Sequence, residues 1–162
     1  MPLTQAPSPS ISCEFAVEPW ADFWRDAKDE LIPKHYAELA LNQGKIPLSP
    51  DIEKYEAAER MGMTHIVTVR SAGKLVGYFI AAIVGHLHYK DAGLMAQTDI
   101  YYLSPEFRKG TGLKMFAFLE ESLKAKGVVK IYLSTKAHQD HGELFGRLGY
   151  QLSDRVFTKL LL

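Results

Sequence analysis

A basic, glycine-bearing segment in the second half of the chain has the composition of an anion-binding turn. Residues 103–113 read Leu-Ser-Pro-Glu-Phe-Arg-Lys-Gly-Thr-Gly-Leu, a proline turn that runs into the start of a helical pattern. Gly110 and Gly112 let the backbone approach a ligand without interference from a Cβ atom. The N–H groups and dipole of a helix start favour negative charge, and Arg108 and Lys109 add two cations. The segment therefore predicts a phosphate or pyrophosphate site, against the plainer interpretation of a surface loop with a solvated Arg-Lys pair.

Histidines are the second group of residues with chemistry near neutral pH. His86 and His88 stand two apart at the end of a predicted strand, so we expect them on one side of it. They could act as bases or ligate a metal ion. No third ligand stands at a recognisable spacing, so a zinc site is not expected. His138 and His141 follow a later strand and are weaker candidates for a base.

Hydrophobic spacing predicts the elements that would position these side chains. Alternating residues indicate strands, and three- and four-residue spacing indicates helices. The expected strands cover residues 11–17, 65–70, 75–85, 94–103 and 128–133. The expected helices cover residues 20–40, 51–61, 109–126 and 142–149, and the first of them should kink near Pro33. A last strand is expected after residue 149. A strand, helix and strand in succession should form a right-handed parallel crossover. The fold class is therefore α/β, a mixed sheet with helices on both faces.

Size and charge limit the classes of function. The chain has 162 residues, which suits one domain over residues 11–162 after a flexible tail over residues 1–10. Its 19 basic and 19 acidic residues cancel, so no overall field attracts nucleic acid or membrane. Cys13 is the only cysteine, and no stretch has the length of a membrane span. We therefore expect a cytoplasmic protein without an intramolecular disulfide, and a homodimer stays open.

Two motifs in order resemble those of the Gcn5-related N-acetyltransferases. That family places a basic residue, a glycine-rich turn and a helix after a strand, as residues 103–113 do here. About thirty residues later it carries Leu-Tyr-x-x-x-Gly-Phe, and this chain has Leu-Phe-Gly-Arg-Leu-Gly-Tyr over residues 144–150. The resemblance covers residues 64–162 well and residues 11–63 by topology only. The wording of both motifs is also similar to acetyltransferase-like proteins of phages and prophages.

The resemblance implies an acyl-CoA N-acyltransferase fold with a splayed pair of parallel strands and acetyl-CoA as co-substrate, without a metal. The pantetheine arm would pair with the backbone of residues 100–103, and the pyrophosphate would lie on the amides of residues 109–113. The implied acetyl-CoA-binding residues are Tyr101, Leu103, Arg108, Lys109, Gly110, Thr111, Gly112, Leu113 and Phe145. The family has two residues between its basic residue and the first glycine. Only Lys109 stands there in this chain, so either the turn is shorter or Phe107 takes the basic position.

The implied reaction moves an acetyl group to a primary amine of an unidentified small molecule or protein. Asp99 is the first candidate for the base that deprotonates the amine, since it stands four residues before Leu103 and is expected on the same face. His86 and His88 are the next candidates. A pairing of Asp99 with a nearby lysine, or a turn cap, is an equally weighted interpretation.

Phe145 occupies the position at which the family has a tyrosine that protonates the leaving thiolate, and phenylalanine cannot donate a proton. A thiolate can leave without an acid, so catalysis is still expected. The alternatives are a non-catalytic relative that binds acyl-CoA or a protein partner, and a small α/β module that binds another phosphate ligand.

Overall fold

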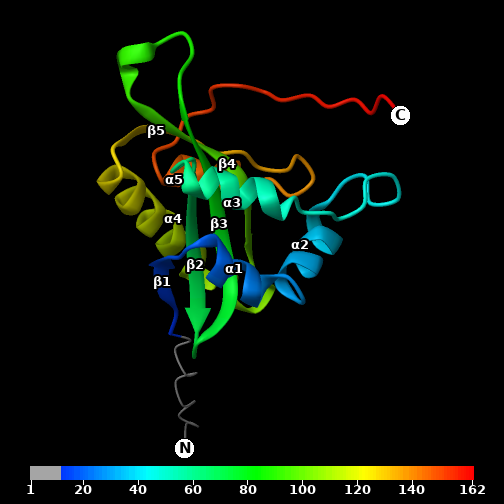
Figure 1. Cartoon of the computed structure of the whole chain (residues 1–162). Helices are drawn as coiled ribbons and strands as arrows, with labels where there is room; N and C mark the ends of the chain where they lie inside the picture. Colours follow the sequence, from blue (N-terminus) through cyan, green and yellow to red (C-terminus); the bar gives the residue numbers. More distant parts are fainter. Residues whose placement is uncertain (1–11) are drawn as a thin grey trace, which may run out of the picture.

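The computed structural model describes residues 12–162, which form a five-stranded sheet in the order β1-β2-β3-β4-β5 (Figure 1). The strands are β1 (Glu14–Val17), β2 (Thr64–Ser71), β3 (Lys74–Gly85), β4 (Leu94–Leu103) and β5 (Val128–Tyr132). Neighbours from β1 to β4 are antiparallel, and β4 and β5 are parallel. The mixed sheet confirms the predicted fold class. The predicted tail over residues 1–10 and the first residue of the predicted first strand lie outside the described residues.

Helices cover both faces of the sheet, as predicted. One face carries α1 (Trp20–Ala27), α2 (Leu31–Leu39) and α3 (Ile52–Arg60), and we call it the α1–α3 face. The other carries α4 (Arg108–Ala125) and α5 (Gly142–Arg147) and is called the α4–α5 face. Short 3-10 helices, η1 (Lys90–Ala92) and η2 (Pro105–Phe107), flank β4. No helix within residues 12–162 is both long and apolar enough to traverse a bilayer.

Each face of the sheet has its own apolar core, because β2, β3 and β4 send alternate side chains to opposite sides. Phe79 and Ala96 pack with Phe116 and Leu119 of α4. Tyr78 and its neighbours pack with α1 and α2 on the other face; the buried members of that core are Trp20, Phe23, Ala27, Leu31, Ile32, Leu39, Ile66, Leu75, Tyr78, Ile80 and Tyr102. Packed side chains therefore hold β4 in place from both faces of the sheet.

Local sequence explains the boundaries that were predicted correctly. The β2–β3 turn has positive φ at Ala72 and Gly73, 48° and 79°, which is the pattern of a two-residue turn that matches strand twist. Asp51 caps α3, with its side chain accepting the backbone N–H of Lys54 at 3.1 Å. The crossover from β4 through α4 to β5 gives the parallel pair that its length predicted.

Two predicted elements differ from the structure. The helix predicted over 20–40 breaks at residues 28–30, and Pro33 lies in the first turn of α2, where its missing N–H costs nothing. The last strand predicted after Gly149 is wrong, because residues 150–162 are irregular. The outer edge of β5 has no neighbouring strand in the described part of the chain. Large apolar side chains of this segment, including Phe157, are exposed.

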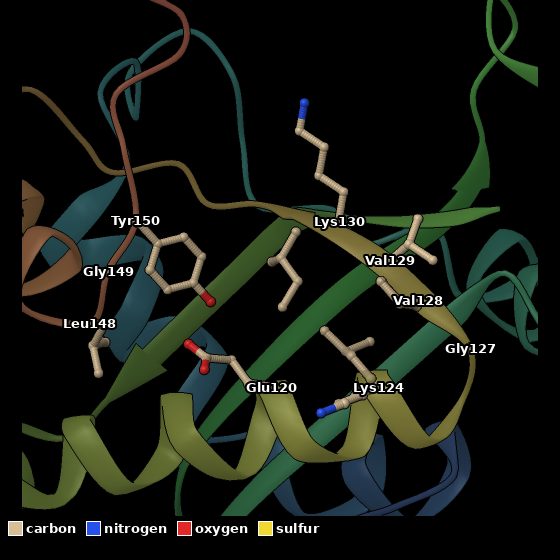
Figure 2. A pocket seen from close by; sticks show the side chains of 11 residues that line it. Glu120, Lys124, Gly127, Val128, Val129, Lys130, Leu148, Gly149 and Tyr150 are labelled. Atoms are coloured by element: carbon tan, nitrogen blue, oxygen red, sulfur yellow. The ribbon is translucent and has the colours of Figure 1, made fainter. Parts of the chain in front are cut away.

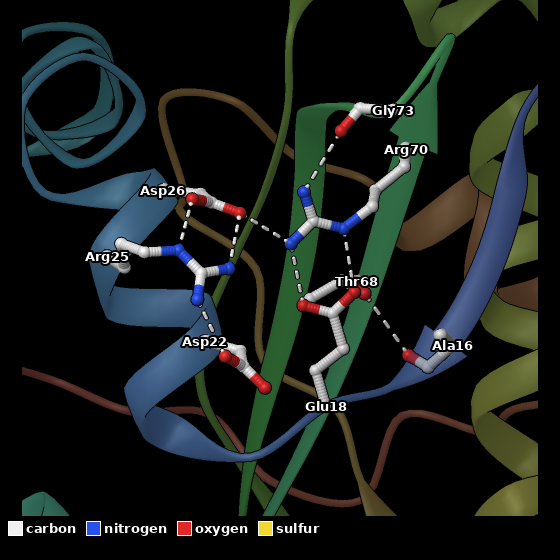
Figure 3. Close-up of polar contacts among 8 residues, drawn as sticks. All are labelled: Ala16, Glu18, Asp22, Arg25, Asp26, Thr68, Arg70 and Gly73. Atoms are coloured by element: carbon white, nitrogen blue, oxygen red, sulfur yellow. Dashed lines mark hydrogen bonds and ion pairs between the residues drawn. The ribbon is translucent and has the colours of Figure 1, made fainter.

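An ion network fixes α1 against the sheet (Figure 3). The Arg70 guanidinium donates to both Glu18 carboxylate oxygens at 2.7 and 2.8 Å, to Asp26 at 2.8 Å and to the Gly73 carbonyl at 3.1 Å. The hydrogen bond from Arg70 outweighs burial and holds the pKa of Glu18 below its ordinary value. Since Glu18 precedes α1 and Asp26 lies in its last turn, this network fixes both ends of the helix relative to β2.

Candidate active site

The parallel strands β4 and β5 separate part-way along their length. Their pairing joins Leu94 to Val128 at one end and Gln97 to Tyr132 at the other, and it does not continue beyond that pair. The Thr98 hydroxyl holds the fork, donating to the Tyr132 carbonyl at 3.1 Å and accepting from the Ser134 N–H at 3.2 Å. Beyond the fork, β4 runs on to Leu103 with β3 as its neighbour. The backbone of residues 99–103 can therefore receive an extended ligand along its second edge.

A β-bulge places Asp99 at this fork. Ile80 of β3 faces Ile100, and the next residue, Ala81, faces Thr98, so Asp99 is the extra residue in β4. The bulge changes the face on which Asp99 lies. Tyr101 packs on the α4–α5 face, whereas the carboxylate of Asp99 reaches α3 on the α1–α3 face. The prediction that Asp99 shares a face with Leu103 is therefore wrong, because simple alternation does not survive an inserted residue.

Tyr55 of α3 orients the exposed carboxylate of Asp99. Its hydroxyl donates to Asp99 Oδ2 at 2.5 Å, and its ring lies almost parallel to Trp20, with centroids 4.2 Å apart. Burial raises the pKa of Tyr55, and the hydrogen bond to Asp99 raises it further, so the hydroxyl stays protonated. Asp99 thus has one oxygen fixed by a stable donor, and its carboxylate lies at the protein surface. Such a carboxylate can accept a proton from an amine directly or through water.

The glycine-bearing turn follows β4 after the short helix η2. Its backbone leaves the helical region at Lys109 and Gly110, where φ of Gly110 is 82°, and regular helix begins at Thr111. A Cβ atom at Gly110 or Gly112 would meet nothing within 4 Å, so the space in front of both residues is open. An open glycine turn before a helix start is the geometry that suits a phosphate.

Arg108 folds back along the surface onto the end of β4 and α2, with its side chain 37% exposed. Its Nε donates to the Leu103 carbonyl at 2.8 Å, and its Nη2 lies 2.7 and 2.9 Å from the two Glu38 oxygens. Burial acts to raise the pKa of Glu38, but hydrogen bonds from Gln139, Arg108 and Tyr102 outweigh it and leave that pKa lowered. Arg108 therefore positions the turn by tying it to α2, and the exposed Lys109 is the cation beside the glycines.

A second polar pair lies on the α4–α5 face. The Tyr101 hydroxyl and His141 Nδ1 are 2.9 Å apart, and the Phe145 ring packs against both residues with centroid distances of 6.4 Å. Burial raises the pKa of Tyr101, while burial and then the nearby charge of Arg108 lower that of His141. The sequence predicted His141 only as a weak candidate for a base, from its place after the strand expected over residues 128–133.

The structure does not bring His86 and His88 to Asp99. They follow β3, whose last residue, Gly85, pairs with Leu94 at the start of β4. Asp99 lies five residues further along β4, roughly 17 Å away at the rise of an extended strand. Within residues 12–162, no three His, Cys, Asp or Glu side chains gather to hold a metal ion.

A separate groove of about 700 Å³ follows the outer edge of β5 (Figure 2). It is bounded by α4, by residues 127–131 and by residues 148–150. The Tyr150 hydroxyl and Glu120 Oε1 are both buried in its wall, where burial and then the Glu120 carboxylate raise the pKa of Tyr150. None of the residues predicted to bind acetyl-CoA lines this groove, so it is distinct from the fork between β4 and β5.

Comparison with solved structures shows the same fold in three acetyltransferases. Glucosamine-6-phosphate N-acetyltransferase from Arabidopsis thaliana is 15% identical, with a TM-score of 0.65 over 93% of this chain and 99% of that one. Ribosomal-protein-alanine N-acetyltransferase from Brucella melitensis biovar Abortus 2308 is 16% identical, with the same TM-score and coverage. An aminoglycoside acetyltransferase from an uncultured soil metagenomic sample, in complex with sisomicin, is 14% identical, with a TM-score of 0.69 over 93% and 97% of the two chains.

The sequence itself was compared with curated proteins and with family models. No curated protein matches it. The likeness to phage proteins therefore stays a prediction. The model described as "Acetyltransferase (GNAT) family" matches residues 19–150, which span α1 through α5, including the fork, the bulge and the glycine turn. The chain therefore belongs to the acetyltransferase (GNAT) family and is an N-acetyltransferase of that type.

Proposed function

We propose that the chain transfers an acetyl group from acetyl-CoA to a primary amine by direct attack of the amine on the thioester. The observation that carries this proposal is the fork between β4 and β5. The unpaired edge of residues 99–103 leads through Ser104 and the short helix η2 into the open glycine turn. A pantetheine arm that pairs with this edge would deliver its pyrophosphate to the turn.

Asp99 is the proposed base. An amine substrate arrives largely protonated, and only its free form attacks a carbonyl carbon. The carboxylate lies beside the edge where the thioester would lie, and Tyr55 fixes one of its oxygens at 2.5 Å. His86 and His88, at the opposite end of β4, are therefore less suited to this role.

The acceptor would approach from the α1–α3 face, because the bulge turns Asp99 to that side. The solved relatives name amine-bearing acceptors of different sizes, an amino sugar phosphate, an aminoglycoside and a ribosomal-protein alanine. These names support an amine acceptor for this chain and leave its size open. A homodimer and a cytoplasmic location remain predictions from the sequence.

Release of CoA from acetyl-CoA in the presence of an amine panel tests the proposal. The panel should contain an amino sugar, an aminoglycoside, a polyamine and a peptide with a free N-terminus. We expect acetyl-CoA to raise the melting temperature and at least one amine to accelerate CoA release above the hydrolysis rate. Stabilisation by CoA without turnover of any amine would favour a non-catalytic acyl-CoA-binding relative. If neither acetyl-CoA nor CoA raises the melting temperature, the proposed acetyl-CoA site at the fork is wrong.

A further inference from the structure

Phe145 stands where the motif Leu-Tyr-x-x-x-Gly-Phe has its tyrosine. The side chains around Phe145 supply a different hydroxyl. Phe145 is 7% exposed and packs edge-to-face on Phe116 at 5.4 Å. Its ring also meets Tyr101 from β4, with the two ring planes at 62°. Tyr101 belongs to the unpaired part of β4 beyond the fork. A hydroxyl therefore lies beside the Phe145 ring, on the strand edge proposed for the pantetheine.

His141 fixes that hydroxyl in place. Its Nδ1 lies 2.9 Å from the Tyr101 oxygen, and its own backbone N–H donates to Thr135 Oγ1 at 2.9 Å. Thr135 in turn donates to the Gln139 carbonyl at 3.1 Å. The contact bridges β4 and the segment that leaves β5, two parts of the chain that separate at the fork. A tyrosine held by this chain of bonds is pre-organised, which a freely rotating hydroxyl is not.

We propose that the Tyr101 hydroxyl, positioned by His141, donates a hydrogen bond to the leaving sulfur in place of the hydroxyl that Phe145 lacks. This inference rests on the proposed acetyl transfer. His141 acts as a positioning residue: in its Nδ1–H form it donates to the Tyr101 oxygen, which leaves the phenol O–H directed at the sulfur.

The bonds balance as follows. The amine nitrogen forms a bond to the acetyl carbonyl carbon, and the carbon–sulfur bond breaks with its electron pair on sulfur. The arriving ammonium first loses one proton to Asp99, and the nitrogen loses a second proton to water after it has bonded to the carbon. The thiolate takes one proton from water, so the products are an amide, a thiol and one released proton. The Tyr101 O–H stabilises the negative charge while it develops on sulfur. An aliphatic thiol with an ordinary pKa of about 8.5 needs this stabilisation less than an alkoxide would.

Burial and the neighbouring charges keep the Tyr101 hydroxyl protonated. Burial and the charge of Asp140 raise the pKa of Tyr101, while the Thr135 hydroxyl acts in the opposite direction. For His141, burial and Arg108 lower the pKa, while Asp140 and Glu38 act to raise it. Both residues are therefore neutral near pH 7, so the pair presents a donor to sulfur without a fixed charge.

Affinity for CoA and for desulfo-CoA, measured by calorimetry, tests the contact without any need for turnover. In the parent, we expect CoA to bind about fivefold more tightly than desulfo-CoA, as one neutral hydrogen bond would give. Tyr101→Phe should bind both ligands alike, and Tyr89→Phe, which removes a hydroxyl of an exposed tyrosine before the start of β4, should keep the parent's preference. The difference between these ratios isolates the hydroxyl–sulfur contact.

Kinetics supply the second measurement. Tyr101→Phe should lower kcat about tenfold to a hundredfold with little change in KM for acetyl-CoA. His141→Ala keeps the hydroxyl but not its orientation, so it should give a smaller loss. Phe145→Tyr in the Tyr101→Phe background should restore part of kcat and of the preference for CoA. A purely structural role for Tyr101 would not produce this rescue.

The outcomes separate this inference from the proposed function. If the parent binds neither CoA nor desulfo-CoA, the acetyl-CoA site itself is wrong and the inference falls with it. If the parent binds CoA and Tyr101→Phe retains both the preference for CoA and the parent's kcat, only the role of Tyr101 is overturned. If Tyr101→Phe does not fold, His141→Ala carries the test, and an unchanged preference for CoA in that variant overturns the positioning role.

Discussion

Arg108 and Glu38 form a charged contact at 2.7 Å across 70 residues of sequence. The contact joins the start of α4 to α2, and Glu38 also accepts from the Tyr102 hydroxyl at 2.9 Å and from Gln139 Nε2 at 3.1 Å. One carboxylate thus organises the strand end, the glycine turn and the loop after β5. The arginine that resembled a phosphate ligand in the sequence is part of the scaffold that shapes the turn.

Glu38→Ala should therefore destabilise the fold. The change leaves three donors, on Tyr102, Arg108 and Gln139, without their acceptor, and we expect a loss of about 2 kcal/mol in the free energy of unfolding. Urea denaturation measures it. The control is Glu143→Ala, which removes an exposed pair with Arg147 on α5 and should change the free energy by less than about 0.5 kcal/mol. Equal losses in the two variants would contradict the organising role of Glu38.

Gly112→Glu should abolish stabilisation by acetyl-CoA. A Cβ atom at this position meets nothing within 4 Å, so the variant should fold normally. Its carboxylate would repel the pyrophosphate at the turn. Acetyl-CoA at a hundred times its dissociation constant should stabilise the parent by about 2.7 kcal/mol. The melting temperature with and without acetyl-CoA measures the effect.

The control for this variant is Gly44→Glu, which adds the same charge at an equally open position between α2 and α3. It should respond to acetyl-CoA as the parent does. If Gly112→Glu keeps the full response, the pyrophosphate does not lie on this turn.

Asp99→Asn should lower kcat/KM on the order of a hundredfold while CoA affinity stays within about twofold of the parent. The amide keeps the shape of the side chain and its contact with Tyr55 but cannot accept the proton of the amine. Tyr55→Phe should give a smaller loss, since Asp99 would keep its charge and lose only its orientation. Steady-state kinetics with the best amine of the panel measure both, and identical rates for Asp99→Asn and the parent would exclude Asp99 as the base.

The stability of the fold should fall as the pH is lowered from 6.5 to 4. His65 is 5% exposed, with Nε2 2.8 Å from Ser122 Oγ, and burial lowers its pKa to about 4. His35, whose Nδ1 lies 2.5 Å from the Tyr78 hydroxyl, also has its pKa lowered to about 4 by burial. A folded pKa below the ordinary value means that the unfolded chain binds protons first, so stability is complete above pH 6.5 and declines below it.

Each such histidine contributes at most about 1.4 kcal/mol per pH unit in this interval. His65→Gln should reduce the pH dependence by the share of one group while keeping a polar contact with Ser122. Urea midpoints at pH 7.0, 6.0 and 5.0 give the slope. A slope in His65→Gln as steep as in the parent would show that this histidine is not buried in its neutral form.

Features set by neighbouring residues could be predicted from the sequence. The turn between β2 and β3 needs positive φ at two adjacent residues, and Gly73 supplies one of them at no cost. Asp51 caps α3 because its acceptor lies within the first turn of the same helix. The crossover through α4 follows from its length alone.

Features set by contacts between distant segments could not be predicted. The bulge at Asp99 depends on how β4 registers against β3, and no local property of residues 97–101 reveals it. The pairing of Arg108 with Glu38 and of Tyr101 with His141 joins residues 70 and 40 positions apart. The expected order of elements placed a strand after Gly149, but a strand also needs a partner, and β5 has none on that side in the described chain.

The pairing of β1 with β2 sets the order of events in folding. Val17 pairs with Val67, and the chain forms α1, α2 and α3 between them, whereas β2, β3 and β4 follow one another through short connections. Closing a loop of about fifty residues costs more chain entropy than closing a hairpin, so β1 should join the sheet after the β2–β3–β4 meander has formed. Destabilising substitutions in the β2–β3 hairpin should then slow refolding, and Phe15→Ala in β1 should mainly accelerate unfolding.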